Sequence, residues 1–380
     1  MRSVVLAVGV LVALAAPAWG AEPAPSTSPT QPTVAAAAWY VVGEDGAVVA
    51  AHDARVPRPM ASITKLMTAI VTLERVRLAD VVTVDPRAAS IGESTAFLRG
   101  GERFSVADLL RGTLVHSAND AAEALALYVG KGSESRFVAM MNAKAKALGL
   151  TDTRYVNPYG LDARGHVSSA RDSTLLIRYA LGIPFVRETL RQEQVSLPGD
   201  GIFPTTDDLL ASWPPLIAGK TGHTALAGWS ETAGATKNGI TVYGTVLGSP
   251  GREARNAALE TLLAYGIDRY RRVVAVAPGR VYAKAATGFG RPDVLLTPRE
   301  GAVRTIPERT PLVERVIAPT TVALPVRARQ PLGSVEVYAG ERLVASVPLV
   351  AAVAVSEPGL GGKLVWYTKR TAHHLWGLVT

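Results

Sequence analysis

Residues Ser62 to Leu73 read SITKLMTAIVTL and predict the central helix of the chain. The residues after Lys65 are apolar almost all round, which is typical of a helix buried inside a domain. On a helix, residues i and i+3 lie one above the other, so we expect Lys65 to stand beside Ser62. Burial disfavours a charged ammonium and favours the neutral amine, which can act as a base. Because a neighbouring base activates a serine hydroxyl, Ser62 is a candidate nucleophile.

Two further short motifs follow along the chain. Ser117-Ala118-Asn119 begins 55 positions after Ser62, and Lys220-Thr221-Gly222 begins 103 positions after Ser117. Each motif alone has an ordinary explanation. The serine of Ser-x-x-Lys could cap a helix, and the motif arises by chance in a chain of this size. Ser-Ala-Asn could be a loop with a local side-chain turn. All three in this order match the residue set of serine acyl-transfer enzymes of the penicillin-binding and β-lactamase type.

Composition sets the class of protein. The chain has 380 residues, enough for two domains, and 48% of them are hydrophobic, enough for a sizeable core. It contains no cysteine, which excludes disulfides, a cysteine nucleophile and a thiolate metal site. The net charge of +8 is spread along the chain and suits an anionic cell envelope. We expect no nucleic-acid binding, because basic residues do not cluster.

The N-terminal segment predicts export. Residues 1–20 contain a basic residue, Arg2, then an apolar run, and then a cleavage site with small residues at Ala18-Trp19-Gly20. These features predict a signal peptide that is cleaved after Gly20. An uncleaved anchor is the alternative, although the run is short for a membrane span. Residues 21–36 are rich in Pro, Ser, Thr and Ala, which predicts a disordered linker.

Residues 37–271 predict an α/β sandwich domain. Two strands flank Glu44-Asp45-Gly46, and two more flank Asn238-Gly239, the strongest short-range hairpin signal. Helical patterns lie between these hairpins, so the first and last strands should share one sheet. After the Ser62 helix, we expect a helix at 105–128 that is interrupted at 117–119. Further helices are expected at Phe137–Leu148, Ser173–Leu181 and Arg255–Tyr270.

The C-terminal part has a different texture. Residues 272–357 contain short valine-rich runs between Gly and Pro, which predicts a small all-β domain without chemistry of its own. Residues 358–380 predict an amphipathic helix that lies on a membrane surface, with a helix docked on the β domain as the alternative. Its apolar face holds Leu364, Val365, Ala372, Leu375, Trp376, Leu378 and Val379, and its basic face holds Lys369, Arg370, His373 and His374.

From about Ala38 to the C-terminus the chain resembles the low-molecular-weight penicillin-binding proteins that are D-alanyl-D-alanine carboxypeptidases. The resemblance goes beyond the three motifs and implies a β-lactamase/transpeptidase-like fold for residues 37–271. The stretches that carry it are 59–69, 97–102, 117–122, 157–162, 166–172, 220–224 and 251–253.

The resemblance also implies residue roles. Ser62 would be the nucleophile that forms an acyl-enzyme and Lys65 the base. Ser117 would pass a proton to the leaving amine, and Asn119 would bind the substrate amide. The expected substrate is a peptidoglycan stem peptide that loses its terminal D-alanine, and β-lactams would inhibit the enzyme.

A second group of residues is implied to bind the substrate. Lys220 and Thr221, followed by Gly222, would hold its terminal carboxylate, and Arg252 would support their charge. The backbone N–H groups of His223 and of the nucleophile would form the oxyanion hole. Neither a cofactor nor a metal ion is expected. The family resemblance places the protein outside the cytoplasm, at the outer face of the cytoplasmic membrane, in the periplasm or in the cell wall.

Some features depart from the family pattern or permit other functions. Ala118 stands where glycine is common, and residues 213–219 lack the acidic residue often found there. His116 is interpreted as structural, and His166 has no partner at metal-ligand spacing. A β-lactamase would need a water-activating glutamate, and none of Glu123, Glu134, Glu188 and Glu193 stands in a Glu-x-x-Leu-Asn sequence. A non-catalytic envelope-binding module is the second alternative.

Overall fold

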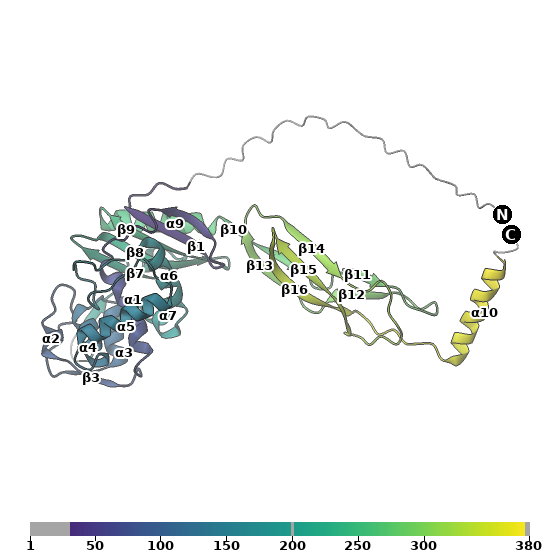
Figure 1. Cartoon of the computed structure of the whole chain (residues 1–380), viewed down its shortest axis with the longest axis horizontal. Helices are drawn as coiled ribbons and strands as arrows, with labels where there is room; N and C mark the ends of the chain where they lie inside the picture. The colour runs from purple at the N-terminus through teal and green to yellow at the C-terminus, as the bar shows by residue number, and fades with distance from the viewer. Residues whose placement is uncertain (1–30, 199–200, 377–380) are drawn as a thin grey trace, which may run out of the picture. The chain divides into compact units, whose positions relative to one another are not determined.

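The computed structural model describes residues 31–198 and 201–376. The expected signal peptide and most of the expected linker lie outside these residues. In the N-terminal part, a five-stranded antiparallel sheet has the order β2-β1-β9-β8-β7 (Figure 1). Its strands are β1 (Ala38–Gly43), β2 (Val48–His52), β7 (Leu216–Thr224), β8 (Gly228–Lys237) and β9 (Ile240–Ser249).

The sheet brings the two ends of this domain together. Strand β1 pairs with β9 over six residue pairs, so the prediction that the first and last strands share one sheet is confirmed. Strands β8 and β9 form the expected hairpin, and Asn238 and Gly239 at its turn have φ values of 54° and 73°. Two positive φ values are what a two-residue hairpin turn requires, because their twist matches that of the strands.

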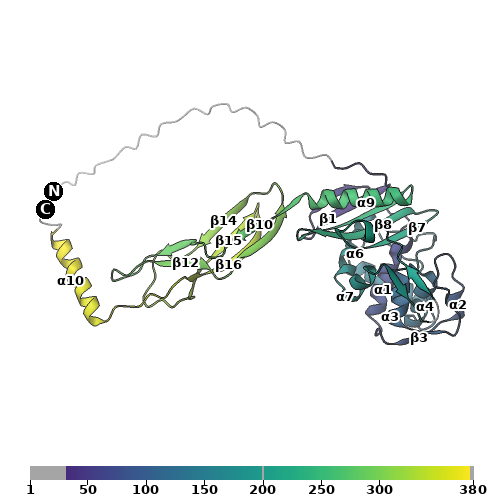
Figure 2. The same ribbon diagram turned by 180° about the vertical axis from the view of Figure 1, so that it is seen from behind.

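Helices cover both faces of the sheet (Figure 2). Helix α9 (Arg252–Ile267) packs on one face through Leu259, Leu262 and Leu263, in a core with Val242 and Val246. Helix α6 (Ala170–Leu181) covers the other face and joins the larger core of the helical half. The other helices of this half are α1 (Thr64–Leu73), α2 (Pro86–Ala89), α3 (Val106–Leu114), α4 (Asn119–Val129), α5 (Glu134–Ala147), α7 (Pro184–Leu190) and α8 (Leu209–Ser212).

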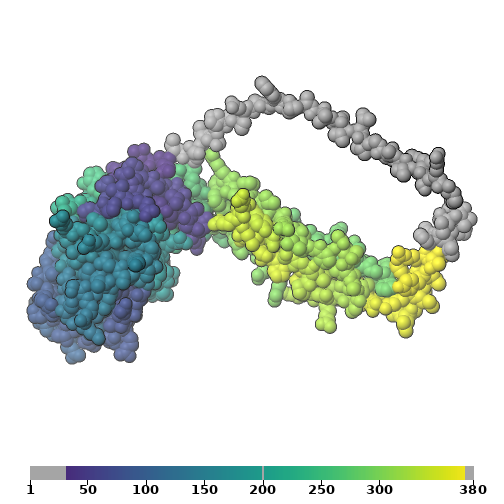
Figure 3. Space-filling model, in the orientation of Figure 1, coloured from purple at the N-terminus to yellow at the C-terminus, as the bar shows by residue number. Residues whose placement is uncertain are grey.

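The described residues of the helical half, which is the blue and teal part of Figure 3, include four short strands. The strands pair as β3 (Val81–Thr83) with β4 (Arg103–Ser105) and β5 (Gln194–Ser196) with β6 (Ile202–Pro204). The expected helix at 105–128 is α3 and α4 with a break at Ser117. The expected helix at 255–270 lies three residues earlier than predicted: it starts at Arg252 and ends at Ile267, and Tyr270 already belongs to the next strand.

The C-terminal part is all-β up to its last helix. A five-stranded sheet has the order β11-β12-β16-β15-β14, and β10 pairs with β13. The strands are β10 (Tyr270–Val276), β11 (Ala283–Ala285), β12 (Val294–Pro298), β13 (Ala302–Pro307), β14 (Leu312–Ile317), β15 (Pro331–Ala339) and β16 (Arg342–Ala351). The sequence did not predict β13, in which Arg304 and Thr305 interrupt the apolar pattern and a proline ends the strand.

The last described element is α10 (Leu360–Trp376), in the region where a helix was expected. Leu360, Leu364 and Val365 are exposed at 89%, 68% and 55%. Among the described residues, no helix combines the length and the apolar character needed to cross a membrane.

Candidate active site

Ser62 lies in a short 3₁₀ turn, η1 (Ala61–Ile63), directly before α1. Ala61 has a φ of 49°, a left-handed conformation that residues other than glycine rarely adopt. The turn leaves Ser62 partly exposed while Lys65, three residues further on, is fully buried. Lys65 Nζ lies 2.8 Å from Ser62 Oγ, as the i, i+3 spacing predicts.

Lys65 is placed to act as a base. Its Nζ contacts Ser62 Oγ, Asn119 Oδ1 at 2.7 Å and the carbonyl oxygen of Tyr159 at 2.6 Å. Burial, together with the nearby charge of Lys220, holds the pKa of Lys65 well below its usual range. The amine is therefore driven toward its neutral form, which has two N–H bonds and one lone pair.

The partners of this amine fix the direction of its lone pair. Asn119 Nδ2 donates to the carbonyl oxygen of Gly92 at 2.8 Å, so the Oδ1 atom is the one that faces Lys65. Asn119 Oδ1 and the Tyr159 carbonyl can only accept hydrogen bonds, so they take the two N–H groups of the amine. In the neutral form of Lys65, the lone pair would then face the hydroxyl of Ser62, where a general base must have it.

Ser117 and Lys220 form the opposite wall. Ser117 lies between α3 and α4 with a φ of 65°, and Lys220 Nζ donates to its Oγ at 3.1 Å. Lys220 is on β7, where its Nζ also donates to the carbonyl oxygen of Thr221 at 3.0 Å. Burial lowers the pKa of Lys220 to about 7. The structure thus brings residues of all three motifs together.

Two glycines permit the close approach of other backbone segments to Ser62. A Cβ atom on Gly222 of β7 would lie 3.0 Å from the Ser62 nitrogen and 2.9 Å from the Met60 oxygen. A Cβ atom on Gly160 would lie only 2.1 Å from the Ala61 oxygen. Real Cβ atoms essentially never approach closer than 3.0 Å, so Gly160 has no room for a side chain.

The remaining predicted binding residues lie around the end of β7. Thr221 Oγ1 is 2.6 Å from Thr206 Oγ1. His223 is exposed, and its ring centroid is 4.2 Å from that of Trp229. Arg252 lies above the same Trp229 ring at 6.0 Å and pairs with Asp208 at 2.7 Å. Within residues 31–198 and 201–376, no hydrogen bond links Arg252 to Lys220 or Thr221.

A buried charged cluster lies behind β7, and sequence reasoning missed it. Asp207, Glu231 and Arg255 are each at most 3% exposed. Arg255 Nε lies 3.0 Å from Glu231 Oε2. Burial, followed by the charge of Asp207, raises the pKa of Glu231 well above its usual range. These carboxyls lie beside Gly219 in the fold, although the segment 213–219 itself has no acidic residue.

A loop across α1 supports the nucleophile from the other side. Thr68 Oγ1 donates to the Pro158 carbonyl at 2.5 Å. His166 Nδ1 accepts from the Val156 N–H at 3.0 Å, so its Nε2 carries the proton and donates to Thr64 Oγ1 at 2.7 Å. His166 is therefore a structural residue of the loop. Over the described residues, no cluster of His, Asp and Glu is arranged to hold a metal ion.

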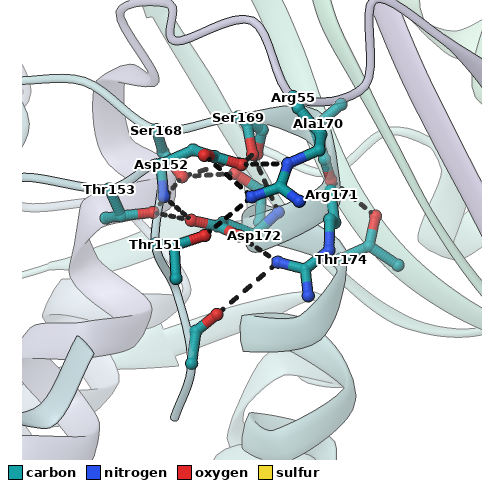
Figure 4. A network of polar contacts seen from close by, with 12 residues as sticks. Arg55, Thr151, Asp152, Thr153, Ser168, Ser169, Ala170, Arg171, Asp172 and Thr174 are labelled. Carbon is teal, nitrogen blue, oxygen red and sulfur yellow. Dashed lines mark hydrogen bonds and ion pairs between the residues drawn. The ribbon is translucent and has the colours of Figure 1, made fainter. Parts of the chain in front are cut away.

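A polar network ties both ends of this loop to α6 (Figure 4). Arg55 pairs with Asp152 at 3.1 Å, and Arg171 pairs with the buried Asp172 at 2.8 Å. Asp172 Oδ2 also accepts from the Asp152 N–H at 2.7 Å and from Thr153 Oγ1 at 2.8 Å. This network links the start of the loop to α6, while Thr64 and Thr68 of α1 contact the loop itself.

Relatives of known sequence and structure show the family of this chain. A family model described as D-alanyl-D-alanine carboxypeptidase matches residues 25–251. The chain belongs to this family. It is 31% identical to D-alanyl-D-alanine carboxypeptidase DacC of Escherichia coli K12, over 91% of this chain and 90% of that protein.

Solved structures show the same fold. Penicillin binding protein 5 from Haemophilus influenzae superposes with a TM-score of 0.64 at 26% identity, covering 86% of this chain and 99% of that chain. The Streptomyces K15 DD-transpeptidase gives a TM-score of 0.60 at 30% identity, covering 63% of this chain and 99% of that chain. Like its family, this chain is a serine D-alanyl-D-alanine carboxypeptidase that forms an acyl-enzyme and binds β-lactams.

Proposed function

We propose that Ser62 is the nucleophile and Lys65 its base in the removal of the terminal D-alanine from peptidoglycan pentapeptide stems. Lys65 takes the hydroxyl proton while Ser62 Oγ bonds to the carbonyl carbon of the penultimate D-alanine. The C–N bond then breaks, and the leaving amine takes a proton through the Ser117 hydroxyl. Water hydrolyses the ester, and its proton returns to Ser62 Oγ. The contact set of Lys65 Nζ carries this proposal.

The same proposal gives the second wall a binding role. Lys220 and Thr221 hold the terminal carboxylate of the substrate, and Gly222 allows β7 to reach the nucleophile turn. The backbone N–H groups of Ser62 and His223 stabilise the oxyanion, since donors aimed at a developing charge lower the barrier. Asn119 donates to the amide of the acyl chain. A cationic pocket for a terminal carboxylate favours a carboxypeptidase over an endopeptidase.

D-Alanine release tests this function directly. The enzyme should release one D-alanine per pentapeptide and leave the tetrapeptide, and Ser62→Ala should abolish release without changing the unfolding midpoint. Cleavage at an internal bond, or release that survives in Ser62→Ala, would overturn the assignment.

We further propose that α10 anchors the exported protein to the membrane surface. Leu360, Leu364, Val365 and Tyr367 are exposed apolar side chains, and Lys369 and Arg370 are exposed cations on the same helix. A helix with both kinds of side chain can lie in the interface of an anionic membrane. Such an anchor fits the proposed boundaries, with a catalytic domain over 37–271 and a β domain over 272–357.

Liposome binding tests the anchor. The chain without residues 358–380 should no longer sediment with anionic liposomes but should keep its reactivity with penicillin. If the full-length chain does not sediment with the liposomes either, α10 is a packing helix rather than an anchor.

A further inference from the structure

The segment from Gly92 to Leu98 is built onto the start of α4. Besides the Gly92 contact with the Asn119 side chain, the Asn119 N–H donates to the Ser94 carbonyl at 2.7 Å. The next residue, Asp120, is buried, and its carboxylate accepts from the N–H groups of Ala96 at 2.9 Å and Leu98 at 3.0 Å. The segment is therefore fixed by its backbone, directly beside the proposed amide-binding residue.

This clamp presents one aromatic side chain to the solvent. Phe97, between the two clamped N–H groups, is 78% exposed and has a φ of 57°. A bulky residue in the left-handed region is a true conformational outlier, because its side chain meets its own backbone. Strained residues that the surrounding structure holds in place cluster at functional sites. In the described chain, nine non-glycine residues have positive φ, and Ala61, Glu93, Phe97 and Ser117 are among them.

Phe97 also forms one wall of a recess. The recess has a volume of about 150 Å³, and Leu197 and Phe203 contribute apolar atoms to it. The ring of Phe203 lies 5.0 Å from the ring of His116, which directly precedes Ser117. One wall of the recess therefore contacts His116, the residue next to Ser117 in the chain.

The chain geometry decides which part of a substrate Phe97 can meet. Ser94 is bonded to Asn119, and three residues span at most about 11 Å, so Phe97 stays close to the Asn119 side of the cleft. In the proposed function, Asn119 binds the amide of the acyl chain, whereas Lys220 and Thr221 hold the leaving D-alanine. An apolar group attached to the acyl amide is therefore the part that comes within reach of Phe97.

We propose that Phe97 is a specificity-determining residue that packs against the apolar atoms of the group attached to the acyl amide of the substrate. This inference rests on the proposed function and names the chemistry of one of its subsites. A rigid aromatic ring loses little conformational freedom on binding, so its contact area is effective. Held in a clamped turn, the ring is already exposed before the ligand arrives.

Two penicillins that differ only in the acyl group test the proposal. Benzylpenicillin carries an apolar phenylacetyl group, and 6-aminopenicillanic acid has the same ring system with a free amine. We expect Phe97→Ala to reduce the ratio of their acylation rate constants roughly tenfold, the effect of losing the contact of one aromatic ring. Phe97→Tyr, which keeps the ring, should restore the ratio.

Controls separate the ring from the strain of the turn. Phe97→Gly removes the ring and relieves the positive φ, so it should lower the ratio as Phe97→Ala does and raise the thermal midpoint. Val48→Ala removes an exposed apolar side chain on β2, the far edge strand of the sheet, and should leave the ratio unchanged.

The outcomes distinguish this inference from the function on which it rests. If the ratio is unchanged in Phe97→Ala and Phe97→Gly, including the case in which both rate constants fall by the same factor, the assignment of Phe97 is overturned although Ser62 is still acylated. Absence of acylation in the unaltered enzyme would overturn the proposed function, and the inference with it.

Discussion

Gly160→Ala should damage both the stability and the reactivity of the enzyme, because the new methyl group meets the nucleophile turn. The added Cβ would lie 2.1 Å from the Ala61 oxygen and 2.9 Å from the Ser62 nitrogen. Reaching the 3.0 Å limit of real Cβ contacts requires the backbone at Ala61 and the loop at Gly160 to separate by about 0.9 Å, and we expect the nucleophile turn to take up much of this shift. A misplacement of that size at a reacting group costs roughly 100-fold in rate.

The stability loss follows from two causes. Gly160 has a φ of 98°, so alanine there pays for a strained backbone as well as for the overlap. Overpacking costs about 1–3 kcal/mol and the positive φ about 1 kcal/mol, so we expect a loss of about 2–4 kcal/mol in unfolding free energy. Urea unfolding measures the stability, and the acylation rate with a fluorescent penicillin measures the reactivity.

Gly149→Ala is the matched control for this prediction. Gly149 also has a positive φ of 70°, but no atom lies within 4 Å of an added Cβ. The control should lose only about 1 kcal/mol and keep its acylation rate. If Gly160→Ala behaves as Gly149→Ala does, the close approach of the 153–168 loop to Ser62 does not determine the geometry of the site.

Three further predictions concern charge. Burial lowers the pKa of Lys220 to about 7, so its ammonium is lost as pH rises above that value. Above pH 7, kcat/KM for a pentapeptide should therefore fall while kcat/KM for an uncharged ester does not; parallel pH profiles would contradict a role of Lys220 in binding the substrate carboxylate. Arg252→Ala should slow D-alanine release more than ester acylation, at the low end of about 1.5–3 kcal/mol because Arg252 is half exposed; equal losses would mean that it acts through Asp208 and the fold. Burial lowers the pKa of His166 to about 4, so between pH 6.5 and 4 the unfolded chain binds more protons than the folded chain. The free energy of unfolding should therefore fall by up to about 3 kcal/mol as pH falls through this range. Urea unfolding of His166→Gln should lack this pH dependence, and an unchanged pH dependence would exclude His166 as its source.

The sequence predicted the parts of the site that short motifs and local periodicity determine. The spacing of Ser62 and Lys65 on one helix and the Asn238-Gly239 hairpin depend on neighbouring residues, so their patterns are visible in the chain. The meeting of Ser117 with Lys220 is a long-range contact, and only the family resemblance implied it.

The parts that the sequence could not predict are those in which unrelated segments meet. Asp207 and Glu231 are ordinary acidic residues in the sequence, and only the pairing of β7 with β8 buries the second of them behind Lys220. Gly160 looks like any turn glycine until the loop is packed against Ala61. The exposure of Phe97 reverses its expected preference for the core, because Asp120 fixes the backbone on both sides of it.

Mass spectrometry after treatment with penicillin shows directly whether Ser62 is the nucleophile of the acyl-enzyme. A proteolytic digest should place one penicilloyl adduct on the peptide that contains Ser62, and Lys65→Met should form that adduct far more slowly, because it keeps the apolar stem of the side chain and removes the base. An adduct on any other residue, or labelling that persists in Ser62→Ala, would show that Ser62 is not the nucleophile.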